Sequence, residues 1–231
     1  MMKQEKSLVV ITGASSGIGL GLAKAFSNAG YPLALLARNV AAMEALNLPN
    51  TRCIKTDVTD IDAFKKAIAL AEEEFGPVDC LINNAGFAEG GEFSEQSHDA
   101  HEKTVQVNLQ GVINGCEAVL PGMRKRGRGT IINMSSVADR SSRPQLATYA
   151  ATKAAVKSLT ESLRMANASY KIRVCNVAPA KIRTPMLMTA NLKGDQIIEI
   201  EDVVNAVLWL YEQPQSVCIP DIVIAPTTYE P

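Results

Sequence analysis

Near its start the chain carries an apolar run, a glycine-rich turn and a helical pattern, in that order. The apolar residues are 8–11, the turn TGASSGIG covers 12–19, and the helical pattern covers 20–29. In a strand–turn–helix unit of this kind the glycines let the backbone approach a pyrophosphate, and the helix N-terminus offers free N–H groups. We therefore expect a dinucleotide at this turn; the alternative is a tight turn without a ligand.

Short apolar runs alternate with longer helical patterns along the rest of the chain. The predicted strands are 7–12, 32–36, 51–56, 79–83, 129–134, 172–177 and 218–224. The predicted helices are 17–29, 39–46, 60–75, 95–106, 108–126, 148–168 and 200–212. Strands that alternate with helices are typical of an α/β fold with a doubly wound parallel sheet. We expect one domain over 1–231, with helices on both faces of a seven-stranded sheet.

The charge balance excludes some classes of partner. Lys plus Arg total 23 and Asp plus Glu total 24, which gives no reason to expect nucleic acid or an acidic membrane surface. No apolar stretch approaches the roughly 20 residues of a membrane span. Residues 1–6 leave no room for a signal peptide before the first strand. We expect a cytoplasmic protein.

The cysteines, histidines and a basic cluster have structural interpretations. The cysteines are Cys53, Cys80, Cys116, Cys175 and Cys218; they are scattered, and no pair has metal-ligand spacing, which suits a reducing cytoplasm. His98 and His101 indicate a surface helix, and we predict no metal site. Basic residues over 124–128 favour a helix C-terminus, followed by Gly127, over a localisation or nucleic-acid signal.

Tyr149 and Lys153 lie four residues apart, so they share one face of the predicted helix 148–168. A free phenol has a pKa near ~10, and a neighbouring ammonium favours the phenolate and lowers that pKa. Tyr149 is thus a candidate proton donor or acceptor for a carbonyl/alcohol pair. This spacing is common by chance, but Ser136 thirteen residues upstream and the glycine turn favour a catalytic site over a solvated helix.

Three further motifs stand in order between the glycine turn and Tyr149. They are NNAG at 83–86, VNLQG at 107–111 and IINMSS at 131–136. With them the chain resembles the classical short-chain dehydrogenase/reductase (SDR) family over essentially its whole length. The resemblance implies a Rossmann-type fold and an enzyme that transfers hydride between a nicotinamide cofactor and a carbonyl or alcohol.

The resemblance also implies a role for each catalytic residue. Tyr149 is the proton donor in reduction, and Lys153 lowers its pKa and binds the nicotinamide ribose. Ser136 hydrogen-bonds the substrate carbonyl; Ser135 is the neighbouring candidate for that role. Asn108 holds a water that links Lys153 to solvent.

The residue after the second predicted strand bears on the cofactor. Ala37 stands where NAD-using relatives carry an acid, and Arg38 can pair with a 2′-phosphate, so NADP(H) is favoured over NAD(H). The alternative is that Arg38 is a surface cation. The implied cofactor-binding residues are Gly13, Ser15, Ser16, Gly17, Ile18, Gly19, Arg38, Asp57, Val58, Asn84, Ala85, Gly86, Tyr149, Lys153, Pro179, Ile182 and Thr184.

The C-terminal half suggests a branch of the family. Segments 118–123, 209–214 and 221–227 are similar to the NADP-dependent 3-hydroxy acid (serine-type) dehydrogenases, which implies small hydroxy acids as substrates. A bulkier carbonyl, such as a 3-oxoacyl thioester, steroid or pterin, is the enzymatic alternative. A non-catalytic NADPH-binding regulator is the alternative from another class. Relatives are commonly homodimers or homotetramers that pair through helices here at 108–126 and 148–168.

Three features depart from the family pattern. Pro179-Ala180 stands where Pro-Gly is usual, beside the nicotinamide. Asp139 replaces a common Gly, and its charge either selects substrate or faces solvent. Segment 185–200 is shorter than the substrate lid of the hydroxy acid branch, which indicates an open pocket or a substrate bound with less closure.

Overall fold

Strands and helices alternate in the computed structural model, which describes residues 6–183 and 197–229. The strands are β1 (Leu8–Thr12), β2 (Leu33–Ala37), β3 (Thr51–Lys55), β4 (Val78–Asn83), β5 (Gly129–Met134), β6 (Ile172–Pro179) and β7 (Asp221–Ile224). The longer helices are α1 (Gly17–Asn28), α2 (Val40–Glu44), α3 (Ile61–Phe75), α4 (His98–Val105), α5 (Gly111–Arg126), α6 (Ala147–Asn167) and α7 (Ile200–Glu212). Each predicted element has its counterpart, with ends that differ by a few residues. The largest strand difference is β7, which begins at Asp221 and not at 218.

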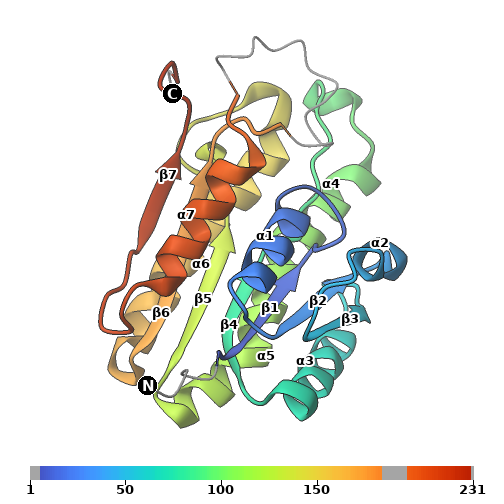
Figure 1. Cartoon of the computed structure of the whole chain (residues 1–231). Helices are drawn as coiled ribbons and strands as arrows, with labels where there is room; N and C mark the ends of the chain where they lie inside the picture. The colour runs from blue at the N-terminus through green and yellow to red at the C-terminus, as the bar shows by residue number, and fades with distance from the viewer. Residues whose placement is uncertain (1–5, 184–196, 230–231) are drawn as a thin grey trace.

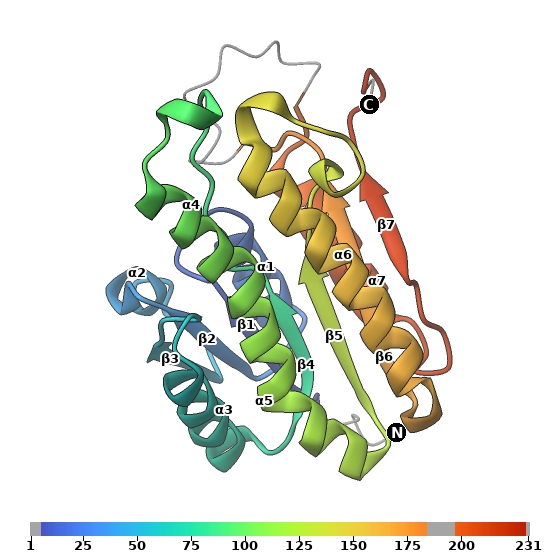
Figure 2. The same cartoon turned by 180° about the vertical axis from the view of Figure 1, so that it is seen from behind.

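The strands form one parallel sheet in the order β3-β2-β1-β4-β5-β6-β7. Helices α1 and α7 cover one face (Figure 1), and α3, α5 and α6 cover the other (Figure 2). This confirms the doubly wound α/β fold. The strand order reverses between β1 and β4, and in such sheets ligands bind outside the carboxyl ends of the strands at that point.

The two helical layers create two hydrophobic cores, one on each face of the sheet. Val9, Ile11, Leu22, Phe26 and Val207 belong to the core beneath α1 and α7. The opposite core contains alternate residues of the same strands, together with apolar residues of α3, α5 and α6. Since successive strand residues point to opposite faces, strands with a core on both sides must be apolar throughout. β7 lies at the edge of the sheet, and its residues alternate between exposed and half-buried.

The basic cluster lies at the C-terminus of α5, as predicted. Gly127 ends the helix with φ +62°. Arg124 Nε donates to Asn167 Oδ1 at 2.7 Å, and Arg128 Nε pairs with Asp79 Oδ1 at 2.7 Å. These side chains therefore bind within the fold.

The two histidines differ in environment. His98 is exposed, but His101 is half-buried, with Nδ1 2.8 Å from Thr148 Oγ1 and its ring 4.7 Å from that of Phe93. The predicted surface helix is confirmed, because most residues of α4 are exposed, although the His101 ring packs partly against its neighbours. No helix in the described part of the chain is long and apolar enough to cross a membrane.

Candidate active site

The glycine turn joins β1 to α1 at the carboxyl edge of the sheet. Gly13 has φ +65°, and a Cβ there would lie 2.8 Å from the Cα of Ala85. A Cβ on Gly19 would overlap the carbonyl oxygen of Gly13 and lie 2.6 Å from Asn84 Nδ2. No side chain caps the N-terminus of α1, and its first turn holds no acid. The turn therefore presents close-packed backbone and uncapped N–H groups, which suit an anion.

A threonine hydroxyl ties this turn to the end of β4. Thr12 Oγ1 accepts hydrogen bonds from the backbone N–H groups of Asn84 (2.9 Å) and Ala85 (3.0 Å). Asn84 Nδ2 donates in return to the carbonyl oxygen of Thr12 at 3.0 Å. The predicted cofactor residues of these two segments thus lie together at the strand-order reversal. The role of Thr12 was missed, because its partners lie 72 and 73 residues away.

The ends of β2 and β3 carry the residues predicted to contact the adenosine half. Arg38 is exposed next to the buried Ala37, and Val58 is buried. Burial acts to raise the pKa of Asp57, but hydrogen bonds from Thr59 and the charge of Arg38 outweigh it and hold that pKa below its usual value. Asp57 is therefore ionised, and the positive charge of Arg38 already interacts with it.

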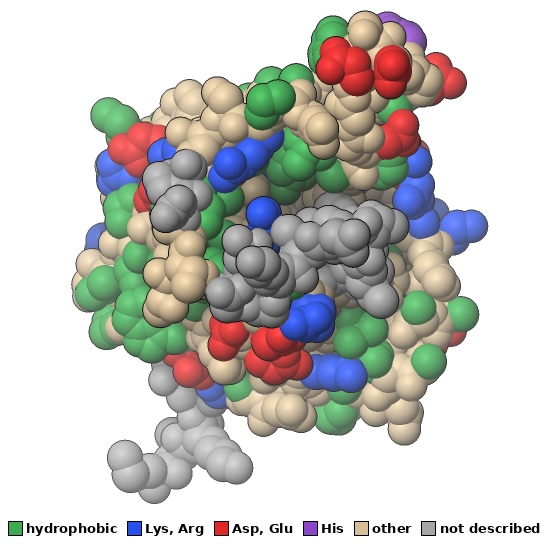
Figure 3. All heavy atoms as spheres, turned by 90° about the horizontal axis from the view of Figure 1, so that it is seen from above, with side chains coloured by type: hydrophobic (Ala, Val, Ile, Leu, Met, Phe, Trp, Pro, Cys, Tyr) green, Lys and Arg blue, Asp and Glu red, His purple; other side chains and the backbone are tan. Residues whose placement is uncertain are grey.

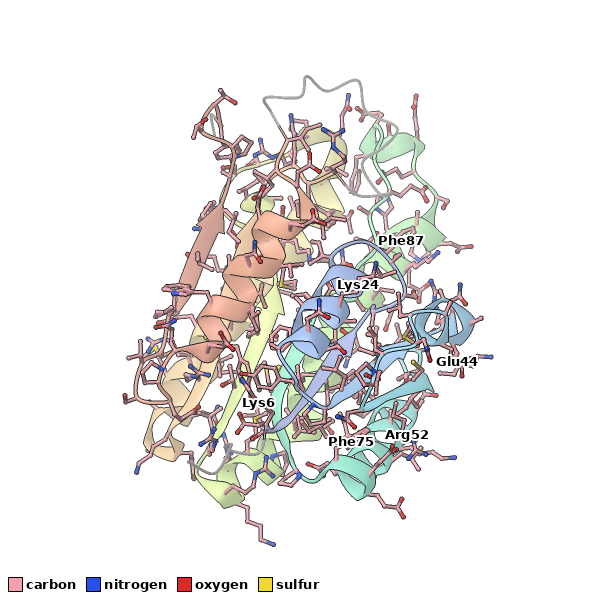
Figure 4. The ribbon with its side chains drawn as sticks, viewed as in Figure 1. Lys6, Lys24, Glu44, Arg52, Phe75 and Phe87 are labelled. Carbon is pink, nitrogen blue, oxygen red and sulfur yellow. The ribbon has the colours of Figure 1, made fainter. Side chains whose placement is uncertain are left out.

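Asn108 lies in a π-helical turn, η2 (Gln106–Gln110), between α4 and α5. The side chain is fully buried. Its Oδ1 accepts from the backbone N–H of Phe87 at 2.7 Å, and its Nδ2 donates to the Phe87 carbonyl at 2.8 Å and to Thr152 Oγ1 at 3.3 Å (Phe87 is labelled in Figure 4). Asn108 thus joins the chain after β4 to α6. Isolated π turns often mark functional sites, yet the sequence pattern predicted only ordinary helix on either side.

Lys153 and Tyr149 lie side by side on α6. Lys153 is buried, its Nζ donates to the Met134 carbonyl at 2.7 Å, and Nζ lies 5.6 Å from the centre of the Tyr149 ring. Burial lowers the pKa of Lys153 to about 8, against an opposing effect of the Asp139 charge. A lysine of this kind exchanges a proton near neutral pH.

The pKa of Tyr149 departs from the expected direction. Burial raises it, a hydrogen bond with Ser136 acts to lower it, and the charge of Asp139 raises it further. The expected lowering by Lys153 is therefore not seen: burial dominates, and the Lys153 ammonium is directed at the Met134 carbonyl. A raised pKa keeps the phenol protonated, which is the form that donates a proton.

The two adjacent serines have different partners. Ser136 Oγ accepts from the Ala138 N–H at 3.2 Å and hydrogen-bonds Tyr149. Ser135 Oγ is buried and donates to Asp139 Oδ2 at 2.9 Å. The geometry favours Ser136, as the spacing suggested. The Asp139 side chain has no exposed surface, so the expectation that it faces solvent is wrong, and its effect on substrate selection stays a prediction.

The segment that follows β6 also lies at the carboxyl edge of the sheet. The Ala180 N–H donates to the Ile224 carbonyl at 2.8 Å, and the buried Ile182 forms a parallel bridge with Ile198. Thr184 and most of the 185–200 segment lie outside the described residues. Figure 3 looks down on this edge of the sheet, where acidic and basic side chains are interspersed with apolar ones.

Known proteins are similar to this chain in sequence. The short chain dehydrogenase family model matches residues 7–195. The chain is 35% identical to glycine betaine reductase ATRR of Emericella nidulans over 95% of its own length, but spans only 18% of that protein. It is 34% identical to an uncharacterized oxidoreductase of Listeria innocua, with 98% of this chain and 99% of the relative covered.

Solved structures of dehydrogenases and reductases have a similar fold. A 3-ketoacyl-(acyl-carrier-protein) reductase from Brucella melitensis complexed with NADH matches with TM-score 0.91 and 27% identity, over 97% of this chain and 99% of that one. The closed form of serine dehydrogenase complexed with NADP+ matches with TM-score 0.91 and 28% identity, over 96% of each chain. Since the family model covers most of its length and the Listeria relative aligns over nearly all of it, this chain belongs to the short-chain dehydrogenase family and is an oxidoreductase.

Proposed function

We propose that this chain is an NADP(H)-dependent oxidoreductase that interconverts a carbonyl and a secondary alcohol. The observation that carries the proposal is the convergence of Ser136, Tyr149, Lys153 and Asn108 at one edge of the sheet, beside the glycine turn. The uncapped N-terminus of α1 and the exposed Arg38 fit the phosphates of the cofactor. When bound, the cofactor supplies or accepts the hydride.

Each residue then has a task that its surroundings support. Tyr149, kept protonated by burial, donates its proton to the carbonyl oxygen. Ser136 Oγ–H hydrogen-bonds the same oxygen and stabilises its developing charge. Lys153, with a pKa of about 8, binds the nicotinamide ribose and returns the proton to Tyr149. Asn108 holds the proton route to solvent and fixes the π turn against Phe87.

The substrate class is part of the proposal. Segments 118–123, 209–214 and 221–227 resemble serine-type dehydrogenases, and the serine dehydrogenase structure matches over 96% of each chain. Small hydroxy acids and their carbonyls are therefore the first candidates. The equally good match to a 3-ketoacyl-(acyl-carrier-protein) reductase supports the alternative, a bulkier carbonyl such as a 3-oxoacyl thioester. We further propose a cytoplasmic homodimer or homotetramer that pairs through α5 and α6.

Binding and turnover separate these proposals. Titration with NADPH and with NADH, followed by nicotinamide fluorescence, should show tighter NADPH binding. NADPH oxidation is then measured with a panel of small keto acids, 3-oxoacyl thioesters, steroids and pterins. Tight NADPH binding without turnover of any carbonyl would favour the non-catalytic regulator.

Tyr149→Phe tests the chemical step. The variant keeps the ring and loses the hydroxyl, so turnover should fall by at least about a hundredfold, the usual worth of a general acid, while NADPH affinity stays near that of the parent. Steady-state kinetics and the same fluorescence titration measure both. Parent-like turnover in the variant would disprove the assignment of Tyr149.

A further inference from the structure

A buried carboxylate lies directly beside the proposed catalytic residues. Asp139 ends the short helical turn η3 (Val137–Asp139), which starts immediately after Ser136. Its Oδ2 accepts hydrogen bonds from Ser135 Oγ at 2.9 Å and from Asn176 Nδ2 at 3.0 Å, and its side chain has no exposed surface. A buried carboxylate is costly unless it is paired and hydrogen-bonded. Its partners must therefore hold it in one geometry.

Arg140 provides the pairing and extends it to β7. Its Nε lies 2.6 Å from Asp139 Oδ1, and one terminal nitrogen lies 3.2 Å from Asp139 Oδ2. Its two terminal nitrogens each donate to one oxygen of Asp221 at 2.9 Å. Both carboxylates raise the pKa of the guanidinium, which stays fully charged. A bidentate fork of this kind fixes direction as well as distance.

A further contact closes the network. Asn176 Nδ2, on β6, donates to Asp221 Oδ1 at 2.8 Å as well as to Asp139. Lys157 Nζ, on α6, lies 3.9 Å from Asp221 Oδ2. We call Asp139, Arg140, Asn176 and Asp221 the Arg140 clamp. It joins the turn that carries Ser136 to the last two strands of the sheet.

Two titratable side chains of α6, Tyr149 and Lys153, lie within reach of the Asp139 charge. Lys153 and Tyr149 both respond to the Asp139 charge, which raises the pKa of each. A negative charge favours the protonated form of both side chains. Arg140 pairs with Asp139 and carries the opposite charge, so we expect it to offset part of this field.

We propose that Asp139 is a positioning residue for the reaction, held by the Arg140 clamp, which fixes the Ser135–Ser136 turn and keeps Tyr149 protonated for carbonyl reduction. This inference rests on the proposed function of Tyr149 and Lys153. The clamp then has two effects. It holds the Ser135–Ser136 turn in place, and the Asp139 charge raises the pKa of Tyr149. The direction of that pKa shift can be measured.

Two variants of opposite sign test the charge effect. Asp139→Asn removes the negative charge but keeps the shape, and Arg140 remains paired with Asp221. Arg140→Gln removes the offsetting positive charge and leaves Asp139 with its bonds from Ser135 and Asn176. Reduction requires protonated Tyr149, so activity falls as pH rises through its pKa. The alkaline limb of the plot of activity against pH should move to lower pH in Asp139→Asn, by roughly half a pH unit to one unit. In Arg140→Gln it should move to higher pH.

The geometric effect is read from kcat. Both variants should lose turnover while the KM for NADPH stays unchanged, because the clamp touches the serine turn and not the glycine turn. Arg164→Gln, which breaks the surface pair with Glu161 on α6, is the matched control and should shift nothing. Loss of kcat with no shift of the limb in either variant, or a shift in the same direction in both, would overturn the proposal.

A readout without turnover separates this inference from the proposed function. Tyrosinate absorbance is titrated in Asp139→Asn and in the parent chain, each corrected with the same protein carrying Tyr149→Phe. The Tyr149 midpoint should be lower in Asp139→Asn even if no carbonyl is reduced. If that variant does not fold, Arg140→Gln is titrated alone and its midpoint should rise. An unchanged Tyr149 midpoint would refute the charge effect, whatever the activity.

Discussion

At the scale of single residues, Arg38 is the residue that we propose to govern the choice of cofactor. It is exposed at the end of β2, next to the buried Ala37, and it lies close enough to Asp57 to help keep that carboxylate ionised. A 2′-phosphate bound to Arg38 would compete with Asp57 for the same positive charge. The proposed preference for NADPH therefore depends on one cation that already interacts with a carboxylate.

Replacing this cation should separate the two cofactors. Arg38→Ala should weaken NADPH binding by about tenfold, the worth of one charge-assisted hydrogen bond, and leave NADH binding unchanged. Fluorescence titration with both cofactors measures the difference. Arg52→Ala is the control, because Arg52 pairs with Glu74 on α3 and lies well away from Phe87 in Figure 4. Equal weakening of both cofactors would show that Arg38 acts on the fold and not on the phosphate.

At the scale of elements, two irregular turns build the site. The glycine turn between β1 and α1 brings backbone against Asn84 and Ala85, at distances that exclude a side chain. The π turn η2 directs Asn108 at Phe87 and Thr152. Regular strands and helices supply the frame, and α6 carries Tyr149 and Lys153. The glycine turn, Asn108 and Ser136 lie where the regular pattern ends, which is usual for parallel sheets.

The glycine turn can be tested by adding one methyl group. Gly19→Ala would force the Gly13 carbonyl and Asn84 apart, so we expect about 1–3 kcal/mol of destabilisation and a marked loss of NADPH affinity. Gly122→Ala in α5 is the control, because its nearest neighbour is the flexible end of Arg126 and alanine favours helix. Urea unfolding and cofactor titration measure both variants. Parent-like binding by Gly19→Ala would contradict a close approach of this turn to the cofactor.

At the scale of the whole molecule, burial between α6 and the sheet sets the charge state of Lys153. Its side chain extends from α6 to the end of β5, where Nζ donates to the Met134 carbonyl. Burial lowers its pKa from 10.5 to about 8. Between these values the unfolded chain binds more protons than the folded chain, so the free energy of unfolding rises with pH.

Lys153→Met removes this linkage. The difference in unfolding free energy, parent minus variant, should increase from about pH 7.5 to about pH 10, because the cost of burying the ammonium is full below the folded pKa and disappears above the unfolded one. Urea unfolding of both proteins at the two pH values measures it. Other titrating groups cancel in the difference. A difference that is constant or falls with pH would contradict the buried ammonium.

The sequence alone was sufficient for the fold and for the placement of most candidate site residues. Apolar runs with periods of 2 and 3.6 are local signals, and the glycine turn needs only its own few residues to be recognised. Ser136, Tyr149 and Lys153 were found because their spacing along the chain matches the family. Their catalytic roles stay predictions, since they depend on bound substrate and cofactor.

Tertiary structure decided what depends on distant partners. Asp139 is buried rather than exposed because Arg140 and Asn176 bond it. Both of these side chains also bond Asp221, which lies 81 residues beyond Arg140 in the chain. The pKa of Tyr149 is raised because packing desolvates it, an effect that no spacing rule contains. Local pattern determined which elements form and in what order; burial and long-range charge, which exist only once those elements pack, determined the protonation of the site.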